Sequence, residues 1–144
     1  CFVKKYEGEQ NAGVRVFLFF YPINRYADLL LLIAEAKILL GQSPDAEINL
    51  VRARAYGSNY NSSTLGFPNQ AIDADAKNAI LQERLFEFVF EGKRWLDLRR
   101  FGNNFVFANT SVLASEAFKI LWPVDRTSLT NNRALTQTPG YPLF

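Results

Sequence analysis

The chain has 144 residues, of which 49% are hydrophobic and 21% charged, with a formal net charge of +2. These values are those of a folded domain with a real core, and the small charge, with arginines interleaved among acids, excludes a disordered chain and gives no support for a nucleic-acid partner. The chain has no histidine and one cysteine, which excludes a histidine zinc site, a Ser-His-Asp triad and an internal disulfide within it. We expect no cofactor and no metal.

Residues 1–23 are predicted to form an extended lead-in. Residues 14–21 are rich in β-branched and aromatic side chains, which indicates a short strand or an extended segment lying across helices, and Pro22 ends it. Cys1 could mark a lipidated N-terminus, but the residues after it read as folded sequence rather than a polar tether. The apolar run at residues 29–33 is far shorter than the roughly 20 residues that span a bilayer. We therefore expect any membrane anchor to lie outside this chain.

Residues 24–57 are predicted to form a helical hairpin. Asn24 is a suitable N-cap for a helix through Leu40, and Gly41 follows as a left-handed stop. Ser43 and the following Pro-Asp restart the chain as a second helix, which Gly57 closes. Helices joined by so short a turn lie antiparallel, as in one unit of a tetratricopeptide-like solenoid.

Residues 58–72 are predicted to form a long loop, and loops of this length are usually functional or disordered. Tyr56, at its start, and Tyr60 and Phe67 within it alternate with Asn and Ser. Such a mixture can stack on sugar rings and hydrogen-bond their hydroxyls, so these three residues are the candidate ligand contacts. The alternative is a surface loop whose aromatic side chains pack back onto the helices.

Residues 73–101 are predicted to form a central helix, capped by Asp73 or Asp75 and apolar through Phe90. Gly92 either kinks this helix or separates it from a short helix over residues 94–101. Helical spacing places one charged stripe of mixed sign on an otherwise apolar surface, with opposite charges three residues apart. We interpret this stripe as an internal ion-pair network that holds shape. Its members are Glu83, Arg84, Glu87, Glu91, Arg94 and Asp97.

The three glutamates of this stripe raise the question of catalysis, because glycosidases use paired carboxylates. Each of Glu83, Glu87 and Glu91 has an arginine within one helical turn. A neighbouring arginine lowers a carboxylate pKa and disfavours the protonated acid that such chemistry needs. We expect no catalytic residues and no enzymatic activity.

Residues 102–144 are predicted to be a loop-rich tail of short extended pieces and turns that wraps the helical core. Turn-forming pairs recur along it, and Pro139-Gly140 stands near its end. Trp122, in an extended segment before Pro123, is predicted to dock onto the helices, and Trp95 is predicted to lie in the core.

Several blocks of this sequence resemble, in the same order, motifs of the SusD/RagB family. Residues 80–102 read ILQERLFEFVFEGKRWLDLRRFG, close to that family's I..ER..EF.FEG.RW.DL.R.G signature. Residues 25–36 (RYADLLLLIAEA), 48–55 (INLVRARA) and 135–141 (LTQTPGY) resemble three further family motifs. The last block departs from the family at Thr138, where Asn is usual.

The resemblance implies the C-terminal part of a SusD-like domain, mainly α, with a tetratricopeptide-like helical scaffold. It also implies a lipid-anchored protein of the outer membrane and cell surface that binds oligosaccharides or other oligomers. Its partner would be a SusC-like TonB-dependent transporter. In that family most of the helical scaffold would precede residue 1, so the isolated chain is predicted to expose a large apolar patch. The alternative is a tetratricopeptide-like scaffold that binds a protein or peptide and no sugar.

Overall fold

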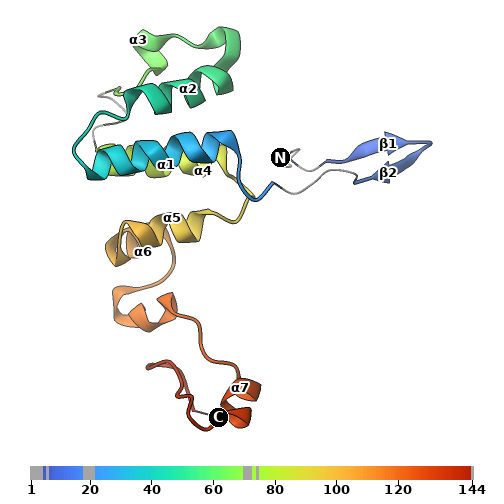
Figure 1. Ribbon diagram of the computed structural model, residues 1–144, viewed down its shortest axis with the longest axis vertical. Helices are drawn as coiled ribbons and strands as arrows, with labels where there is room; N and C mark the ends of the chain where they lie inside the picture. Colours follow the sequence, from blue (N-terminus) through green and yellow to red (C-terminus); the bar gives the residue numbers. More distant parts are fainter. Residues whose placement is uncertain (1–4, 6, 18–21, 70–72, 74, 144) are drawn as a thin grey trace. The chain divides into compact units, whose positions relative to one another are not determined.

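The computed structural model describes residues 5, 7–17, 22–69, 73 and 75–143 and divides the chain into two compact units, residues 1–94 and 95–144. Helices dominate both units, which confirms the prediction of a mainly α fold (Figure 1). Cys1 and residues 18–21 of the predicted extended segment lie outside the described residues.

The first unit opens with a short antiparallel hairpin of β1 (Glu9–Asn11) and β2 (Val14–Val16), in which Gln10 pairs with Arg15. Ala12 and Gly13 form the connecting turn, both with positive φ, as a two-residue hairpin turn requires. An extended segment was predicted here, but its pairing with an earlier strand was not.

Helices α1 (Tyr26–Leu39) and α2 (Asp45–Tyr56) occupy the region predicted to be a helical hairpin, and they pack against each other. Gly41 has a φ of 69° just after α1, as a left-handed stop should. The predicted cap is wrong, because Arg25 rather than Asn24 occupies the N-cap position and makes no side-chain capping bond. The Arg25 guanidinium instead reaches carboxylates beyond α4 and at its end.

Helix α4 (Ala76–Glu87) packs on α1, and Asp75 caps it by accepting a hydrogen bond from the Lys77 amide. The core of this unit therefore lies where α1 meets α2 and α4 (Figure 1). Its buried apolar side chains come from all three helices, three residues apart on α1 and α2 and consecutive on α4. They include Leu31, Ala34, Ile48, Val51, Ala79, Ile80 and Leu81.

The predicted central helix ends earlier than its apolar pattern suggests. It was expected to continue to Phe90, but α4 stops at Glu87 and the chain turns through Phe90, which has a φ of 63°. The next helix, α5, is Arg94–Arg100, and Gly92 lies between the two with positive φ. Gly92 thus separates two helices, one of the two predicted alternatives, but the turn begins before it.

The second unit contains three further short helices: α6 (Asn103–Asn109), the 3-10 helix η2 (Ala114–Ile120) and α7 (Arg126–Asn131). They take the place of several extended pieces predicted from the sequence. The side chain of Asp125 accepts hydrogen bonds from the amides of Thr127 and Ser128 and so caps α7.

The last residues of the chain hold the extended segment after η2 in place. Gln137 exchanges two hydrogen bonds with the backbone of Val124, of 2.8 and 3.1 Å. The Tyr141 hydroxyl donates to the Leu121 carbonyl. Trp122, on this segment, is 83% exposed, so the prediction that it docks onto the helices is wrong for this chain.

Candidate ligand pocket between α2 and α4

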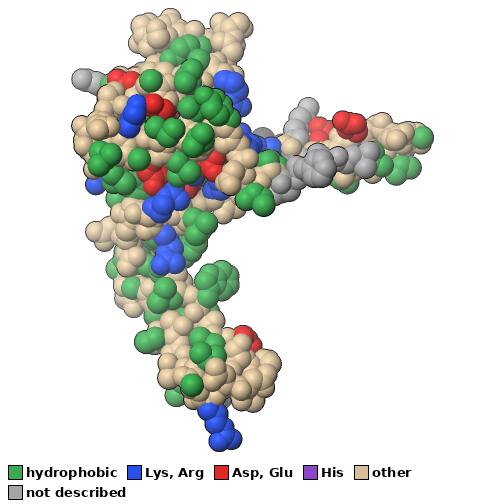
Figure 2. Space-filling model, in the orientation of Figure 1, with side chains coloured by type: hydrophobic (Ala, Val, Ile, Leu, Met, Phe, Trp, Pro, Cys, Tyr) green, Lys and Arg blue, Asp and Glu red, His purple; other side chains and the backbone are tan. Residues whose placement is uncertain are grey.

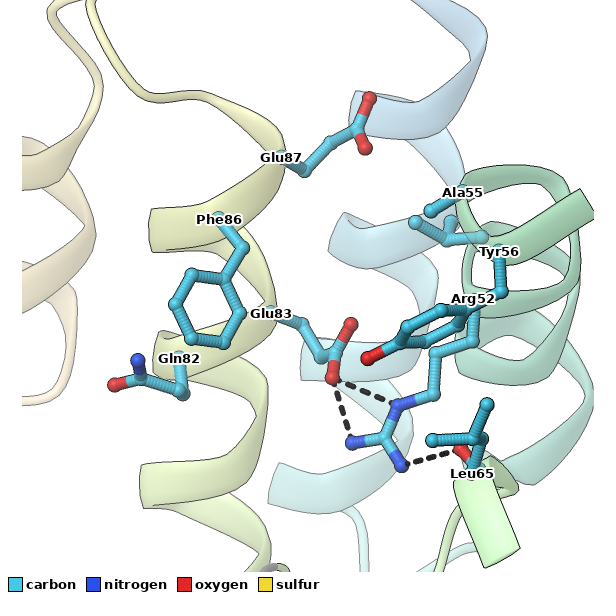
Figure 3. Close-up of a pocket in the computed structure, with 9 residues that line it drawn as sticks. Arg52, Ala55, Tyr56, Leu65, Gln82, Glu83, Phe86 and Glu87 are labelled. Atoms are coloured by element: carbon cyan, nitrogen blue, oxygen red, sulfur yellow. Dashed lines mark hydrogen bonds and ion pairs between the residues drawn. The ribbon is translucent and has the colours of Figure 1, made fainter. Parts of the chain in front are cut away.

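A pocket of about 600 Å³ lies between α2 and α4, entirely within the first unit. Tyr56 follows Arg52 by one turn of α2, and Phe86 follows Glu83 by one turn of α4, so helical spacing turns all four side chains toward the same space. In Figure 3 the Tyr56 and Phe86 rings lie on opposite sides of the Glu83 carboxylate. The remaining lining residues are Val51, Ala55, Leu65, Gln82 and Glu87.

Arg52 is buried at this pocket and joins α2 to α4 and to the loop (Figure 3). Its two terminal nitrogens donate to the two carboxylate oxygens of Asp73, each over 2.9 Å, and its Nε donates to Glu83 Oε1 over 2.7 Å. Arg52 Nη1 also donates a hydrogen bond to the Leu65 carbonyl oxygen over 3.0 Å. Burial opposes the charge of Arg52, but the hydrogen bonds that it donates to Asp73 and Glu83 outweigh burial and raise the pKa of the guanidinium. The group is therefore charged and fixed.

Asn49 organises the loop after α2. Its side-chain oxygen accepts hydrogen bonds from the Phe67 amide, over 2.7 Å, and the Tyr60 hydroxyl, over 3.1 Å, while its nitrogen donates to the Phe67 carbonyl. Two short helices, η1 (Gly57–Asn59) and α3 (Ser62–Leu65), lie inside what was predicted to be a loop. Residues 70–72 of that loop lie outside the described part of the chain.

The three aromatic residues predicted as ligand contacts lie in different surroundings. Tyr56 is 47% exposed and lines the pocket. Phe67 is only 7% exposed, and the Arg52 guanidinium lies 5.6 Å from its ring centre. Tyr60 is half-buried and bound to Asn49. The structure brings Tyr56 to the pocket, whereas Tyr60 and Phe67 pack inward, as in the alternative interpretation of the loop.

The electrostatics of Glu83 differ from the sequence-based expectation. Burial raises its pKa above the ordinary value of 4.5, and the hydrogen bond from Arg52 offsets this only in part. Nearby Asp73 and Glu87 add to the increase. The expectation that arginine would lower the pKa of every glutamate on this stripe is therefore wrong for Glu83, because desolvation dominates there.

The predicted pairs three residues apart are also wrong for two members of the ion-pair network. Within the described chain, Glu87 binds Arg25 and Arg54, not Arg84. Glu91 binds Arg25 and Lys5, not Arg94, and these hydrogen bonds overcome its burial and lower its pKa. For Glu91 the cause is the early end of α4, which removes it from the helical stripe, whereas Glu87 ends α4 and pairs with arginines of other elements.

The other predicted members bind mainly to neighbouring elements. Arg84 pairs with Asp28 on α1 over 2.9 Å, and Lys93 binds the other oxygen of Asp28 over 2.6 Å. The buried ring of Phe88 lies within 5.4 Å of the charged ends of Arg25, Arg84 and Lys93. Arg94 donates to the Leu81 carbonyl, and Asp97 pairs with Arg100.

Reasoning from the sequence missed the partners that these residues find on other elements, among them Arg25, Asp28, Arg52 and Asp73. The available signal was weak, because Asp28 and Arg52 differ from other charged residues of their helices only in facing the core, and neither helix has a clear apolar face to mark those positions. Asp73 lies between stretches that the structure does not describe and has no pattern around it.

The described residues contain no group of three or more acidic, histidine or cysteine side chains arranged to hold a metal ion. Within the same residues, no helix has both the length and the apolar character needed to cross a bilayer.

Comparison with known proteins gives consistent matches. The sequence profile of the SusD family matches residues 18–141. SusD-like protein P38 of Formosa agariphila is 36% identical over 120 residues, and SusD-like protein P2 of the same organism is 30% identical over 128 residues. Each alignment covers 81% of this chain but only 24% and 25% of the relatives, so the chain spans about a quarter of their length.

Solved structures match over almost the whole chain. B. fragilis NanU is 48% identical with a TM-score of 0.85, over 96% of this chain and 31% of NanU. A SusD superfamily protein from Bacteroides vulgatus is 46% identical with a TM-score of 0.86, over 96% of this chain and 32% of that protein. These matches confirm the predicted helical scaffold.

Proposed function

This chain belongs to the SusD family, and we propose on that premise that its protein captures oligosaccharides, or other oligomeric nutrients, at the cell surface. The proposal extends to a lipid anchor in the outer membrane and to delivery of the captured oligomer to a SusC-like TonB-dependent transporter. The single observation that supports it most is the family match over residues 18–141, together with two solved relatives above 45% identity.

The geometry supports binding rather than catalysis. The carboxylates of Glu83, Glu87 and Glu91 are all engaged by arginine or lysine. Glu83 has the raised pKa of a possible acid, but the second carboxylate of the pocket, Glu87, is held between two arginines. A glycosidase needs a second carboxylate free to act as nucleophile or base.

The test of glycan capture is calorimetry on the intact protein that contains this chain. The titrants are neutral and acidic oligosaccharides and, in parallel, a peptide library. We expect saccharide binding without release of shorter products over hours. Binding of peptides alone would contradict the proposal and favour the alternative, a tetratricopeptide-like scaffold for proteins or peptides.

Delivery and location have a separate test. The intact protein, tagged in its native host, is expected to co-purify with a TonB-dependent transporter from outer membranes. It should also be digested when whole cells are treated with protease. Recovery from the soluble cell fraction, with no transporter attached, would contradict both statements.

A further inference from the structure

We propose that the pocket between α2 and α4 is a subsite for an uncharged sugar ring, which stacks on the exposed rings of Tyr56 and Phe86 and bonds to Glu83. This inference rests on the proposed glycan-capture function and names a site for it. It assigns the contact to two facing helices, which hold side chains more firmly than a surface loop does.

Two exposed aromatic side chains, Tyr56 and Phe86, line the pocket. Tyr56 is 47% exposed and Phe86 is 67% exposed, although both belong to regular helices with buried neighbours. Their rings approach the pocket from opposite helices (Figure 3). A pyranose ring presents a face of C–H groups, which suits stacking on an aromatic surface, while its hydroxyls remain at the edge.

Two polar groups at the pocket, the Glu83 carboxylate and the Tyr56 hydroxyl, can form further hydrogen bonds. Glu83 Oε1 accepts the hydrogen bond from Arg52 Nε and pairs with Arg52 Nη2, and no described residue bonds to Glu83 Oε2. The Tyr56 hydroxyl likewise has no hydrogen-bond partner among the residues that the structure describes. In Figure 3 this hydroxyl points toward the Glu83 carboxylate. A sugar hydroxyl between them can donate to Oε2 and accept from the tyrosine.

The charges of the lining select against an acidic sugar. Two carboxylates, of Glu83 and Glu87, face the pocket, and its one described cation, Arg52, is already bound to Asp73 and Glu83. A sugar carboxylate here would meet like charge with no uncommitted partner. The volume of about 600 Å³ lies within the usual range for small-ligand sites, roughly 300–1,000 Å³.

The experiment is calorimetry on the intact protein with neutral gluco-, manno- and xylo-oligosaccharides and with an oligogalacturonate as acidic probe. We expect at least one neutral probe to bind more tightly than the acidic one. Tyr56→Ala and Phe86→Ala should each weaken that binding by about tenfold. Tyr56→Phe, which keeps the ring, should weaken it less. Tyr26→Ala, an exposed tyrosine of α1 outside this pocket, is the matched control and should bind as the parent does.

The other possible results contradict either the subsite, the uncharged ligand class or the glycan-capture function. No binding of any saccharide overturns the glycan-capture function and this subsite together. Neutral saccharide binding that is unchanged in Tyr56→Ala and Phe86→Ala overturns the subsite and leaves the function standing. Tighter binding of oligogalacturonate that depends on Tyr56 overturns the uncharged ligand class. A lower melting temperature for both alanine variants, with unchanged binding, shows that protein packing fills the pocket and also overturns the subsite.

Discussion

The guanidinium of Arg52 joins two carboxylates and one loop carbonyl from a single buried position. A lysine can supply the charge but not the planar fork that meets both oxygens of Asp73. Because every group involved is largely buried, loss of the fork leaves at least one carboxylate without its partner.

We predict that Arg52→Lys lowers the free energy of unfolding by about 3 kcal/mol, the lower end of the range for a broken buried ion pair. The control is Arg54→Lys on the same helix, where the side chain is 59% exposed and the expected change is about 0–1 kcal/mol. Urea denaturation of the two variants measures the difference, and equal midpoints would contradict the prediction.

Asp28 predicts how stability depends on pH. Burial raises its pKa, but the hydrogen bonds from Lys93 and Arg84 outweigh burial and hold the pKa below 3.8 in the folded protein. The unfolded chain therefore takes up this proton first, so the stabilisation is present above pH 3.8 and is lost as pH falls through the folded pKa. Glu91 acts in the same direction, while the raised pKa of Glu83 acts in the opposite one.

We expect Asp28→Asn to be less stable than the parent at neutral pH and to lose less further stability on acidification. Urea midpoints measured from pH 7 to pH 3 give the two slopes. Asp45→Asn, on α2 and without an ion-pair partner among the described residues, should keep the slope of the parent. An Asp28→Asn slope as steep as that of the parent would show that other groups carry the acid sensitivity.

Among the elements, α4 shows where the sequence stops being informative. Its start could be predicted, because Asp75 is a capping residue next to the helix. The hairpin of α1 and α2 could be predicted for the same reason, because Gly41 marks the end of α1 in the local sequence. The end of α4 could not, because the apolar pattern continues through Phe90 while the backbone leaves the helix at Phe88. A left-handed phenylalanine has no local signature, and the turn at Phe90 lies between Phe88 and Glu91, which are both buried.

We predict that Phe90→Gly is more stable than Phe90→Ala by about 1 kcal/mol, because glycine adopts a φ of 63° without strain and alanine does not. The two variants remove the same exposed ring, so their difference isolates the backbone. At Phe86, inside α4, the order should reverse by about 1 kcal/mol. The same order at both positions, in thermal or urea melts, would rule out the left-handed turn.

The candidate site was predictable only in part, for a related reason. Tyr56 was identified from its aromatic character and its place at the edge of a loop, and the structure does bring it to a pocket. Phe86 belongs to the apolar surface predicted around the charged stripe of this helix, and nothing in that pattern marks its ring as exposed. Which side of an apolar helix is covered depends on which helices pack against it, and the sequence of one helix does not contain that information.

At the scale of the whole chain, large hydrophobic side chains stand on the solvent side of the helices as well as in the core. Figure 2 shows hydrophobic side chains lying among the charged groups on the face drawn. The exposed ones include Tyr26, Leu29 and Ile33 on α1 and Leu50 on α2. Scattered exposed leucines are ordinary, but a concentration on two adjacent helices indicates a surface that packs against another structure.

We therefore predict that these 144 residues, prepared alone, bind an apolar dye such as anilinonaphthalene sulfonate. The double variant Leu29→Glu/Leu50→Glu, which changes exposed positions only, should reduce that fluorescence without lowering the helix content seen by circular dichroism. Absence of dye binding together with a well-dispersed NMR spectrum would contradict the prediction.

Lys5 links the N-terminal segment to the turn after α4, which affects how the chain unfolds under force. Its ammonium donates to the Glu87 carbonyl over 2.7 Å and pairs with the Glu91 carboxylate over 2.5 Å, so the start of the described chain is fastened to the bend that follows α4. A pulling force applied at the N-terminal end of the described chain would act first on the Lys5 contacts with residues 87–91 and only afterwards on α1. Pulled from its front end, the molecule should yield at residues 87–91 before its hairpin of long helices opens.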